Sequence, residues 1–366
     1  MSVPSLEEFD QQLEAAHMRG QWLYDEMLES VIGGPKPAGV PFIWRWPDVE
    51  EKLLESCDVL EESFTARRNL SFINPAARGT THTMNMGMQM LKPGEIAWAH
   101  RHTMSALRFA VKGGSDLVTV VDGEPCPMED YDLVLTPRWT WHDHHNATSD
   151  NVVWLDILDI GLILSLNVPF YEPFGEERQP ERSDVAEYLL ERGGPLRPAW
   201  ERPKKANFPY RYPWSEVEKQ LHRMAKLDGS PYDGVVLRYA NPVTGGPTMP
   251  TMDCWVQLLR AGEETQAHRH TSSAVYFVIR GEGVTVVDDT ELDWKQHDSF
   301  VIPNWSEHRF VNRSSEDAIL FSVNDMPALQ ALGLYFEKPQ LSVGVQAPPP
   351  VPADVRRAAP DSGADV

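Results

Sequence analysis

Positive charge is scarce in this sequence of 366 residues: 33 Lys and Arg stand against 54 Asp and Glu, giving a formal net charge of −21 and a pI near 4.9. Proteins that bind nucleic acid through its phosphates concentrate basic side chains, so no nucleic-acid partner is expected. No apolar run approaches the roughly 20 residues that span a bilayer, and the first residues lack the pattern of a secretion signal. We therefore expect a cytoplasmic protein without a membrane partner.

Cysteine is equally scarce. The three cysteines, Cys57, Cys126 and Cys254, have no CxxC spacing, so the sequence indicates neither a disulfide framework nor a thiolate zinc site. A bound metal is then expected to use nitrogen ligands. The hydrophobic content of 42% is sufficient for two domains, each with its own core.

The character of the sequence changes several times along the chain. Ser5-x-x-Glu8 predicts a capped amphipathic helix near the N-terminus, and short β-branched runs separated by turn residues begin near Ser71 and again near Val235. The residues after Lys338 are rich in Pro, Ala and Gly. We expect five segments: an N-terminal helical region (1–70), a first β-rich, metal-binding domain (71–166), a linker with helices (167–234), a second β-rich domain (235–337) and a disordered tail (338–366).

One histidine pattern occurs in both β-rich segments. It comprises His100, His102 and His142 in the first copy, and His268, His270 and His308 in the second. Two histidines at positions i and i+2 of a strand point to the same side, so both can reach one ion. The third histidine must come from a strand folded back beside the pair, as in a small antiparallel barrel. The sequence therefore predicts two three-imidazole metal sites.

These residues resemble the cupin family, and their order resembles the gentisate 1,2-dioxygenase group of two-cupin proteins, which includes salicylate and 1-hydroxy-2-naphthoate dioxygenases. The resemblance spans about residues 40–325 and rests on Val40-Pro-Phe-Ile-Trp44, Asn74-Pro75, Gly94-x5-His100-x-His102, Ala106-Leu-Arg108-Phe109 and Trp154-Leu-Asp156. It implies a mainly β bicupin fold with two antiparallel jelly-roll barrels behind an N-terminal helical region. It also implies Fe(II) and a homo-oligomer, a tetramer in relatives.

The ligand set indicates a type of reaction. The common cupin pattern has a glutamate five residues after the second histidine, but this chain has Leu107 and Val275 there, so we expect both sites to lack a carboxylate. Three neutral imidazoles leave a divalent ion with its full charge and open positions, which favours a chelating dianion such as an ortho-hydroxybenzoate. Nitrogen ligands alone would also accept zinc, nickel or copper.

The two copies differ beside the histidines. Gly87, Arg108, His144 and Asp156 of the first copy correspond to Trp255, Tyr276, Phe310 and Ser322 of the second. The first copy keeps polar groups, whereas the Trp255 indole would fill the space that a substrate ring needs. We predict that the first site is catalytic and that the second is a degenerate site that can still hold a metal.

Roles follow as hypotheses for the catalytic site. Arg108 pairs with the substrate carboxylate, His144 accepts or holds the phenolic proton or stabilises the activated dioxygen, and Asp156 orients His144. As resemblance implies, Arg67 or Arg68 adds a second cation for the carboxylate.

The strand Met84–Met90 is expected to place its methionines in the core and Asn85, Gly87 and Gln89 toward the metal, lining the substrate. Many relatives carry an aromatic residue at the position of Asn85. An amide there suits a polar ring substituent.

The expected function is a non-haem Fe(II) ring-cleaving 1,2-dioxygenase that inserts both atoms of O2 into an ortho-hydroxybenzoate, between the carboxyl- and hydroxyl-bearing carbons. Gentisate or another 5-substituted salicylate, such as 5-nitrosalicylate, is the expected small aromatic acid. The alternatives are a 1-hydroxy-2-naphthoate or salicylate dioxygenase, another metal-dependent cupin enzyme, and a non-catalytic bicupin binding protein.

Overall fold

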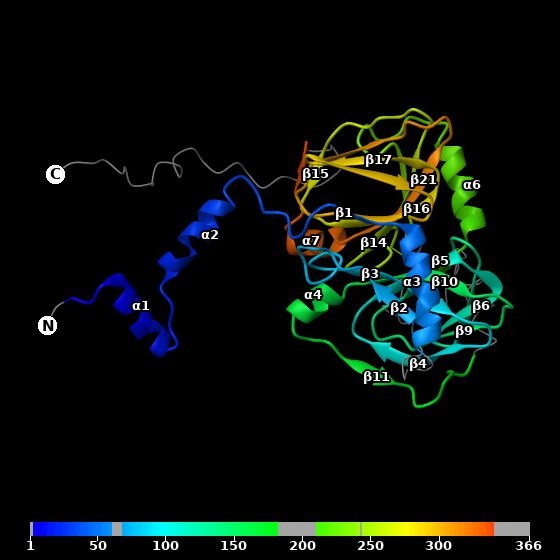
Figure 1. Cartoon of the computed structure of the whole chain (residues 1–366), viewed down its shortest axis with the longest axis horizontal. Coiled ribbons are helices and arrows are strands. Elements are labelled where there is room, and N and C mark those ends of the chain that lie inside the picture. The colour runs from blue at the N-terminus through cyan, green and yellow to red at the C-terminus, as the bar shows by residue number, and fades with distance from the viewer. Residues whose placement is uncertain (1–2, 61–67, 182–209, 242–243, 340–366) are drawn as a thin grey trace, which may run out of the picture.

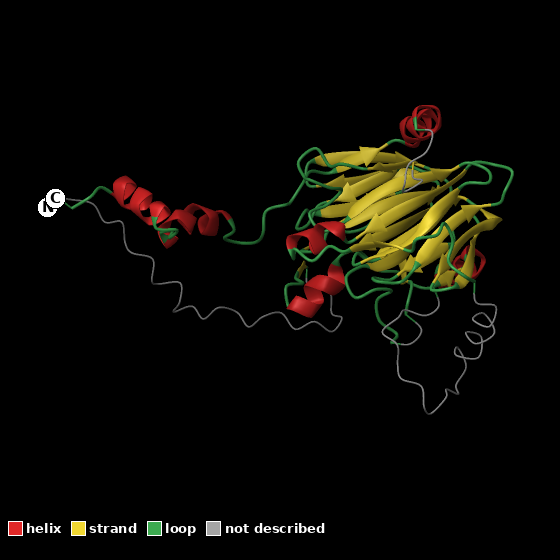
Figure 2. Ribbon diagram, turned by 90° about the horizontal axis from the view of Figure 1, so that it is seen from below, coloured by secondary structure: helices red, strands yellow, loops and turns green. Residues whose placement is uncertain are grey.

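Two six-stranded antiparallel sheets lie back to back in the middle of the molecule, and each belongs to one β-barrel (Figure 1). The computed structural model describes residues 3–60, 68–181, 210–241 and 244–339. The view in Figure 2 shows the strands stacked in layers, with helices at the edges of the stack. The expectation of a mainly β chain with two antiparallel barrels is confirmed.

The first barrel contains a six-stranded sheet in the order β12-β8-β5-β10-β3-β2 and a five-stranded sheet in the order β11-β4-β9-β6-β7. Its elements are β2 (Arg68–Ser71), β3 (Asn85–Leu91), β4 (Ile96–His102), β5 (Ala106–Lys112), β6 (Gly114–Val121), β7 (Glu124–Met128), β8 (Leu133–Thr136), β9 (His142–Asn146), β10 (Val152–Leu158), α4 (Ile160–Ser165) and β11 (Tyr171–Pro173).

The second barrel repeats this plan with a sheet in the order β1-β19-β16-β21-β14-β13, facing the smaller sheets β18-β17-β20 and β15-β22. Its elements are β13 (Val235–Arg238), β14 (Asp253–Leu259), β15 (Arg269–His270), β16 (Ala274–Arg280), β17 (Glu282–Val287), β18 (Thr290–Lys295), β19 (Ser299–Ile302), β20 (His308–Val311), β21 (Ala318–Asn324), α7 (Met326–Leu332) and β22 (Glu337–Lys338).

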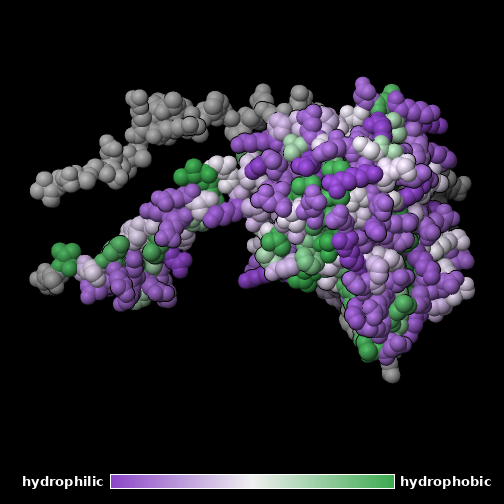
Figure 3. Space-filling view, turned by 45° about the horizontal axis from the view of Figure 1, so that its top comes forward, coloured by the Kyte–Doolittle hydropathy of each residue, from purple (hydrophilic) through white to green (hydrophobic). Residues whose placement is uncertain are grey.

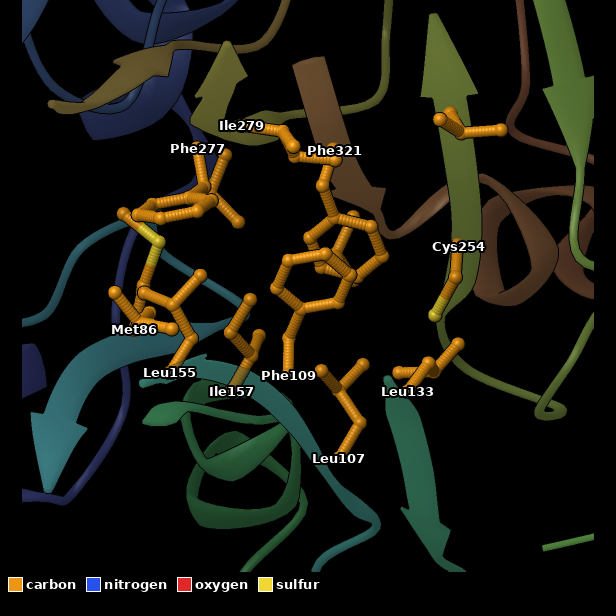
Figure 4. Close-up of a cluster of buried hydrophobic side chains, with 14 of the residues drawn as sticks. Met86, Leu107, Phe109, Leu133, Leu155, Ile157, Cys254, Phe277, Ile279 and Phe321 are labelled. Carbon is orange, nitrogen blue, oxygen red and sulfur yellow. The ribbon is translucent and has the colours of Figure 1, made fainter. Parts of the chain in front are cut away.

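The largest apolar core lies between the two barrels. Met86, Met88 and Met90, from one face of β3, belong to it, as the alternation of the strand predicts. Phe109 of the first barrel stacks on Phe321 of the second with ring centroids 4.0 Å apart (Figure 4). Each barrel also has an internal apolar cluster on the opposite face of its large sheet.

Each large sheet receives an edge strand from the segment that precedes the other barrel. Strand β1 (Phe42–Trp44), followed by helix α3 (Trp46–Val59), pairs with β19 of the second barrel. Strand β12 (Arg211–Tyr212), followed by helix α6 (Trp214–Met224), pairs with β8 of the first barrel. We refer to β1 and β12 as the crossover strands.

An aspartate anchors each crossover strand. Asp298 accepts from the Trp46 backbone N–H at 2.8 Å and pairs with Arg45. Asp132 correspondingly accepts from the Trp214 backbone N–H at 2.7 Å and pairs with Arg211. Burying these carboxylates is offset by the charged and backbone donors that they receive.

The sheets extend beyond the segment boundaries expected from sequence. The 1–70 segment contains β1 and the start of β2, and the 167–234 segment supplies β11 and β12 to the first barrel. Lys338, placed in the expected tail, ends β22, and residues 340–366 lie outside the described residues. Turn composition could not reveal these additions, because an edge strand of two or three residues has too little pattern to be recognised.

The first helices form an arm that projects from the barrels (Figures 1 and 2). It consists of α1 (Leu6–Ala15), the 3-10 helix η1 (Gln21–Tyr24) and α2 (Asp25–Ser30), none of which has a buried residue. The expected capping box is present, since the Glu8 backbone N–H donates to Ser5 Oγ and the Ser5 N–H donates to Glu8 Oε2. In the described residues, no helix is both long and apolar enough to cross a membrane.

Candidate metal centre

The three histidines of the first barrel converge at the centre of the smaller sheet. His100 and His102 lie on β4, and His142 begins β9, where it pairs opposite His100. One nitrogen from each ring lies within 4.8 Å of those from the other two. All three side chains are buried. Strand alternation and an antiparallel return thus give the arrangement that the spacing predicts.

Each of these imidazoles is oriented by a backbone carbonyl. Nδ1 of His100 lies 2.7 Å from the Trp98 carbonyl oxygen. The corresponding distances are 2.8 Å from His102 to Met104 and 3.0 Å from His142 to Thr140. A carbonyl can only accept, so Nδ1 carries the proton and Nε2 carries the lone pair of the neutral ring. Carbonyl bonds of this kind commonly orient metal-binding histidines.

The donor set fits a divalent metal ion. His142 Nε2 is buried without a hydrogen-bond partner in the described part of the chain, which is costly unless a ligand is bound there. Burial, with smaller effects from His100 and His102, lowers the pKa of His142 well below its usual range. The ring is therefore neutral at physiological pH, as metal binding requires.

Arg108 and Asp156 lie side by side on the sheet that faces the three histidines. Asp156 of β10 is opposite Arg108 of β5 and, on its other side, Gly87 of β3. Arg108 is 2% exposed, donates to Thr136 Oγ1 at 2.8 Å, and has its Nε 3.3 Å from Asp156 Oδ1. Burial lowers the pKa of Arg108, and Asp156 opposes this effect.

Asp156 does not have the partner that the sequence suggested. It was expected to orient His144, but its Oδ2 accepts from Asn69 Nδ2 at 3.0 Å and its Oδ1 faces Arg108. His144 Nδ1 instead lies 2.7 Å from the hydroxyl of Thr119, which is opposite it on β6. Both Asn69 and Thr119 were missed, because cross-strand register is not readable from a single sequence.

Of the three β3 residues expected to line the substrate, only Gln89 keeps a buried polar atom without a hydrogen-bond partner among the described residues. Gln89 is buried, and its Nε2 has no hydrogen-bond partner among the described residues. Asn85 Oδ1 accepts from the Thr80 backbone N–H at 3.2 Å, so the amide serves the preceding turn. A Cβ at Gly87 would lie 2.6 Å from the Leu70 carbonyl oxygen, so this glycine permits the close approach of β2.

The second cation expected for the substrate is not Arg68. Arg68 lies opposite Met90, on the face of the sheet that points away from the histidines. Its Nη1 pairs with Glu95 Oε2 at 2.6 Å and its Nη2 donates to the Leu60 carbonyl. The period of two explains the error, because neighbouring strand positions point to opposite faces. Arg67 lies outside the described residues.

The second barrel also brings its three histidines together. One nitrogen from each of His268, His270 and His308 lies within 4.8 Å of the others. Burial lowers the pKa of both His268 and His270 to about 4.

Aromatic groups line the second barrel where the first has Arg108 and His144. Ser322 lies between Trp255 and Tyr276 in the register, as Asp156 lies between Gly87 and Arg108. Tyr276 stacks on Phe300 with ring centroids 4.8 Å apart and contacts Phe310. Aromatic side chains therefore surround the second triad on the side where the first triad faces polar side chains.

Comparisons with known proteins agree with this architecture. The model of the Cupin domain matches residues 87–158 and 255–324. The chain is 50% identical to 1-hydroxy-2-naphthoate 1,2-dioxygenase of Nocardioides sp. strain KP7, over 92% of this chain and 88% of that protein. It is 34% identical to gentisate 1,2-dioxygenase 1 of Aquipseudomonas alcaligenes, over 90% of this chain and 95% of that protein. The chain belongs to the gentisate 1,2-dioxygenase family.

A solved structure shows how far the likeness to this family extends. Salicylate 1,2-dioxygenase from Pseudoaminobacter salicylatoxidans, determined as adducts with gentisate, superposes with a TM-score of 0.82 at 30% sequence identity. The match covers 92% of this chain and 94% of that one. The resemblance to the gentisate 1,2-dioxygenase family inferred from motifs is therefore confirmed over nearly the whole chain.

Replacing His142 by Ala should weaken divalent-metal binding at the first barrel about 100-fold or more, because one of three converging nitrogens is lost. Metal content after reconstitution with Fe(II), measured by mass spectrometry, should fall by about one ion per chain. His145→Ala is the matched control, since His145 lies on the opposite face of β9, near Arg178 and Glu181. Equal metal content in the wild type and His142→Ala would contradict the assignment.

Proposed function

We propose that this chain is a ring-cleaving dioxygenase whose reaction takes place in the first barrel. The observation that carries the proposal is a buried group of three imidazoles facing a buried arginine. Three neutral ligands leave the positive charge of an ion uncompensated, which favours an anionic chelating substrate. Membership in a family whose relatives are named 1,2-dioxygenases supports this reaction type.

The proposed substrate class is an aromatic acid with a hydroxyl ortho to its carboxylate. The catalytic metal is proposed to be Fe(II), held by His100, His102 and His142. When bound, the metal supplies coordination sites for the hydroxy acid and the redox chemistry that activates O2. The ring is opened between the carboxyl- and hydroxyl-bearing carbons, and both oxygen atoms enter the product.

Arg108 is proposed to bind the substrate carboxylate. Its Nε and Asp156 Oδ1 are both buried without a formal hydrogen bond, although they lie 3.3 Å apart. The guanidinium is therefore positioned by charge but retains donor capacity for an incoming anion. Asp156, held in turn by Asn69, acts as a positioning residue that keeps Arg108 in place.

His144 is proposed to take the phenolic proton. The Thr119 hydroxyl has a single proton and is also within hydrogen-bond distance, 2.9 Å, of Met128 Sδ. When that proton points to the sulfur, Thr119 accepts from His144 Nδ1–H at 2.7 Å. The lone pair of the neutral ring then resides on Nε2, which makes His144 a proton acceptor.

We further propose 1-hydroxy-2-naphthoate as the preferred substrate. Identity of 50% to the Nocardioides enzyme named for this acid supports the choice. The earlier preference for gentisate or 5-nitrosalicylate depended on Asn85 meeting a polar ring substituent, and the Asn85 amide oxygen is occupied by Thr80. Gentisate remains the second candidate, because another relative carries its name.

Oxygen consumption by Fe(II)-loaded protein tests the proposed substrate directly. Addition of 1-hydroxy-2-naphthoate should start O2 uptake with a kcat/KM at least about tenfold above those for gentisate, salicylate and 5-nitrosalicylate, about 1.4 kcal/mol of discrimination. A higher value for gentisate would overturn the naphthoate assignment alone. Absence of uptake with all four acids would count against the dioxygenase proposal.

Two substitutions separate the proposed roles of the polar residues. Arg108→Met should raise KM about 10- to 100-fold, the equivalent of one lost charged hydrogen bond. His144→Gln should lower kcat by about 10²–10⁴ with a smaller effect on KM, because a proton acceptor is lost. Steady-state kinetics normalised to bound Fe(II) give both values. Loss of Fe(II) in either variant would assign that residue to metal retention instead.

The N-terminal arm supports a proposal on assembly. Large apolar side chains on it are exposed, including Leu23, Tyr24, Met27 and Leu28, and Figure 3 shows green patches along the arm. Helices this short are marginally stable alone, so an apolar surface of this kind favours a protein contact. We propose that the arm packs on another copy of the chain in a homo-oligomer, such as the tetramer expected by resemblance.

Analytical ultracentrifugation measures the assembly. The wild type should sediment as a multiple of the 41.4 kDa chain, and Leu23→Glu with Leu28→Glu should shift it toward smaller species, because burying a carboxylate in an apolar contact is costly. Glu29→Gln, on the same arm, is the control and should leave the assembly unchanged. A monomeric wild type at micromolar concentration would be incompatible with the proposal.

A further inference from the structure

Two of the three histidines in the second triad retain the orientation needed to bind metal, whereas His268 Nδ1 is buried without a hydrogen-bond partner among the described residues. Nδ1 of His270 lies 2.8 Å from the Ser272 carbonyl oxygen, and Nδ1 of His308 lies 3.0 Å from that of Ser306. Their Nε2 atoms therefore carry the lone pairs, as in the first barrel. His308 is 1% exposed, and its Nε2 has no hydrogen-bond partner in the described residues. A purely structural histidine would be expected to satisfy this nitrogen.

A carboxylate lies near the second triad, although both groups of converging donors consist of histidines alone, as expected. Asp233 precedes β13, and its Oδ1 is 3.7 Å from His268 Nε2. Its Oδ2 accepts from Ser230 Oγ at 3.0 Å, and 16% of its side chain is exposed. Two donors that each lie about 2.0–2.2 Å from one ion are separated by at most about 4.4 Å. Asp233 is not among the donor atoms that all lie within 4.8 Å of one another, a group made up of His268, His270 and His308, so its carboxylate lies beside the ion position without being one of the ligands.

Charge and shape distinguish the two sites. The Asp233 carboxylate near His268 partly offsets the charge of a dication bound by the three neutral imidazoles, so this site attracts a dianion less strongly than a site without a nearby carboxylate. The aromatic groups Tyr276 and Phe310 take the places of Arg108 and His144. The surroundings thus favour holding an ion and disfavour binding an aromatic acid.

The position of the second triad suggests what an ion would stabilise. His270 is in β15, which pairs with β22 near the end of the described chain. His268 is joined to His308 by an isolated bridge, and Asp233 belongs to the turn before β13. An ion bound to the three imidazoles would add a cross-link between two segments that backbone hydrogen bonds already join, such as the one from the Trp305 N–H to the His270 carbonyl at 2.7 Å.

We propose that the second barrel binds a divalent transition-metal ion through His268, His270 and His308, with the Asp233 carboxylate nearby, in a structural site distinct from the proposed catalytic centre. This site requires no aromatic substrate. Imidazole ligands suit Zn²⁺, Fe²⁺, Co²⁺ or Ni²⁺.

Cobalt binding tests this proposal without reference to catalysis. Full-length protein, stripped with a chelator and reconstituted with Co²⁺, should bind about two ions per chain in the wild type, one in His142→Ala, one in His308→Ala and none in the double variant. Metal content is measured by mass spectrometry, and the visible absorption of Co²⁺ reports its coordination. A wild type with one ion per chain, together with no ion in His142→Ala, would overturn the second site.

Asp233→Asn, made in the His142→Ala background, tests the carboxylate. It should weaken Co²⁺ binding at the second barrel about tenfold, because a negative charge near His268 is lost. The matched control is Asp228→Asn, which removes one negative charge from the same exposed loop. Unchanged affinity in Asp233→Asn would show that this carboxylate does not stabilise the bound ion.

Anomalous diffraction from cobalt-loaded wild-type crystals covers the case in which His142→Ala fails to fold. A peak at both triads supports the proposal, and a peak at the first alone overturns it. This test is independent of the proposed dioxygenase function. If that function were wrong, O2 uptake would be absent but the protein would still bind two ions per chain.

Discussion

The fixed orientation of three imidazoles is the interaction on which the function of this chain depends. Each Nδ1 of the first triad is held by a carbonyl oxygen two residues away, from Trp98, Met104 or Thr140. Those carbonyls belong to strands and tight turns that cannot shift without disturbing the barrel. The rigid backbone therefore prepares the metal ligands before any ion arrives, which reduces the free energy cost of organising them.

Local periodicity explains what was predictable from the sequence. Histidines two apart on one strand had to share a face, and a recurring third histidine required a returning strand, so both triads were predicted. The core role of Met86, Met88 and Met90 followed from the same alternation. These features depend on spacing within a single strand or on repetition along the chain.

What could not be predicted depends on contacts between strands. Thr119 replaces Asp156 as the partner of His144 because β6 happens to pair with β9 in that register. Arg68 was misplaced because an error of one position reverses the face of a strand. Asp233 was not recognised beside His268, since it comes from a turn rather than from the repeated motif. Short edge strands such as β12 carry too few residues to show a pattern.

The crossover strands have a consequence for biosynthesis. Residues 42–44 pair with residues 299–301, so the second sheet cannot be completed until the ribosome has made roughly 250 further residues, on the order of 10–50 s at typical elongation rates. The large sheet of the first barrel likewise cannot be completed until β12 has been synthesised. Each half therefore depends on the other for one edge strand of its large sheet, and gene fragments encoding one barrel would lack that edge. This mutual dependence gives selection a reason to retain the second barrel that is independent of catalysis.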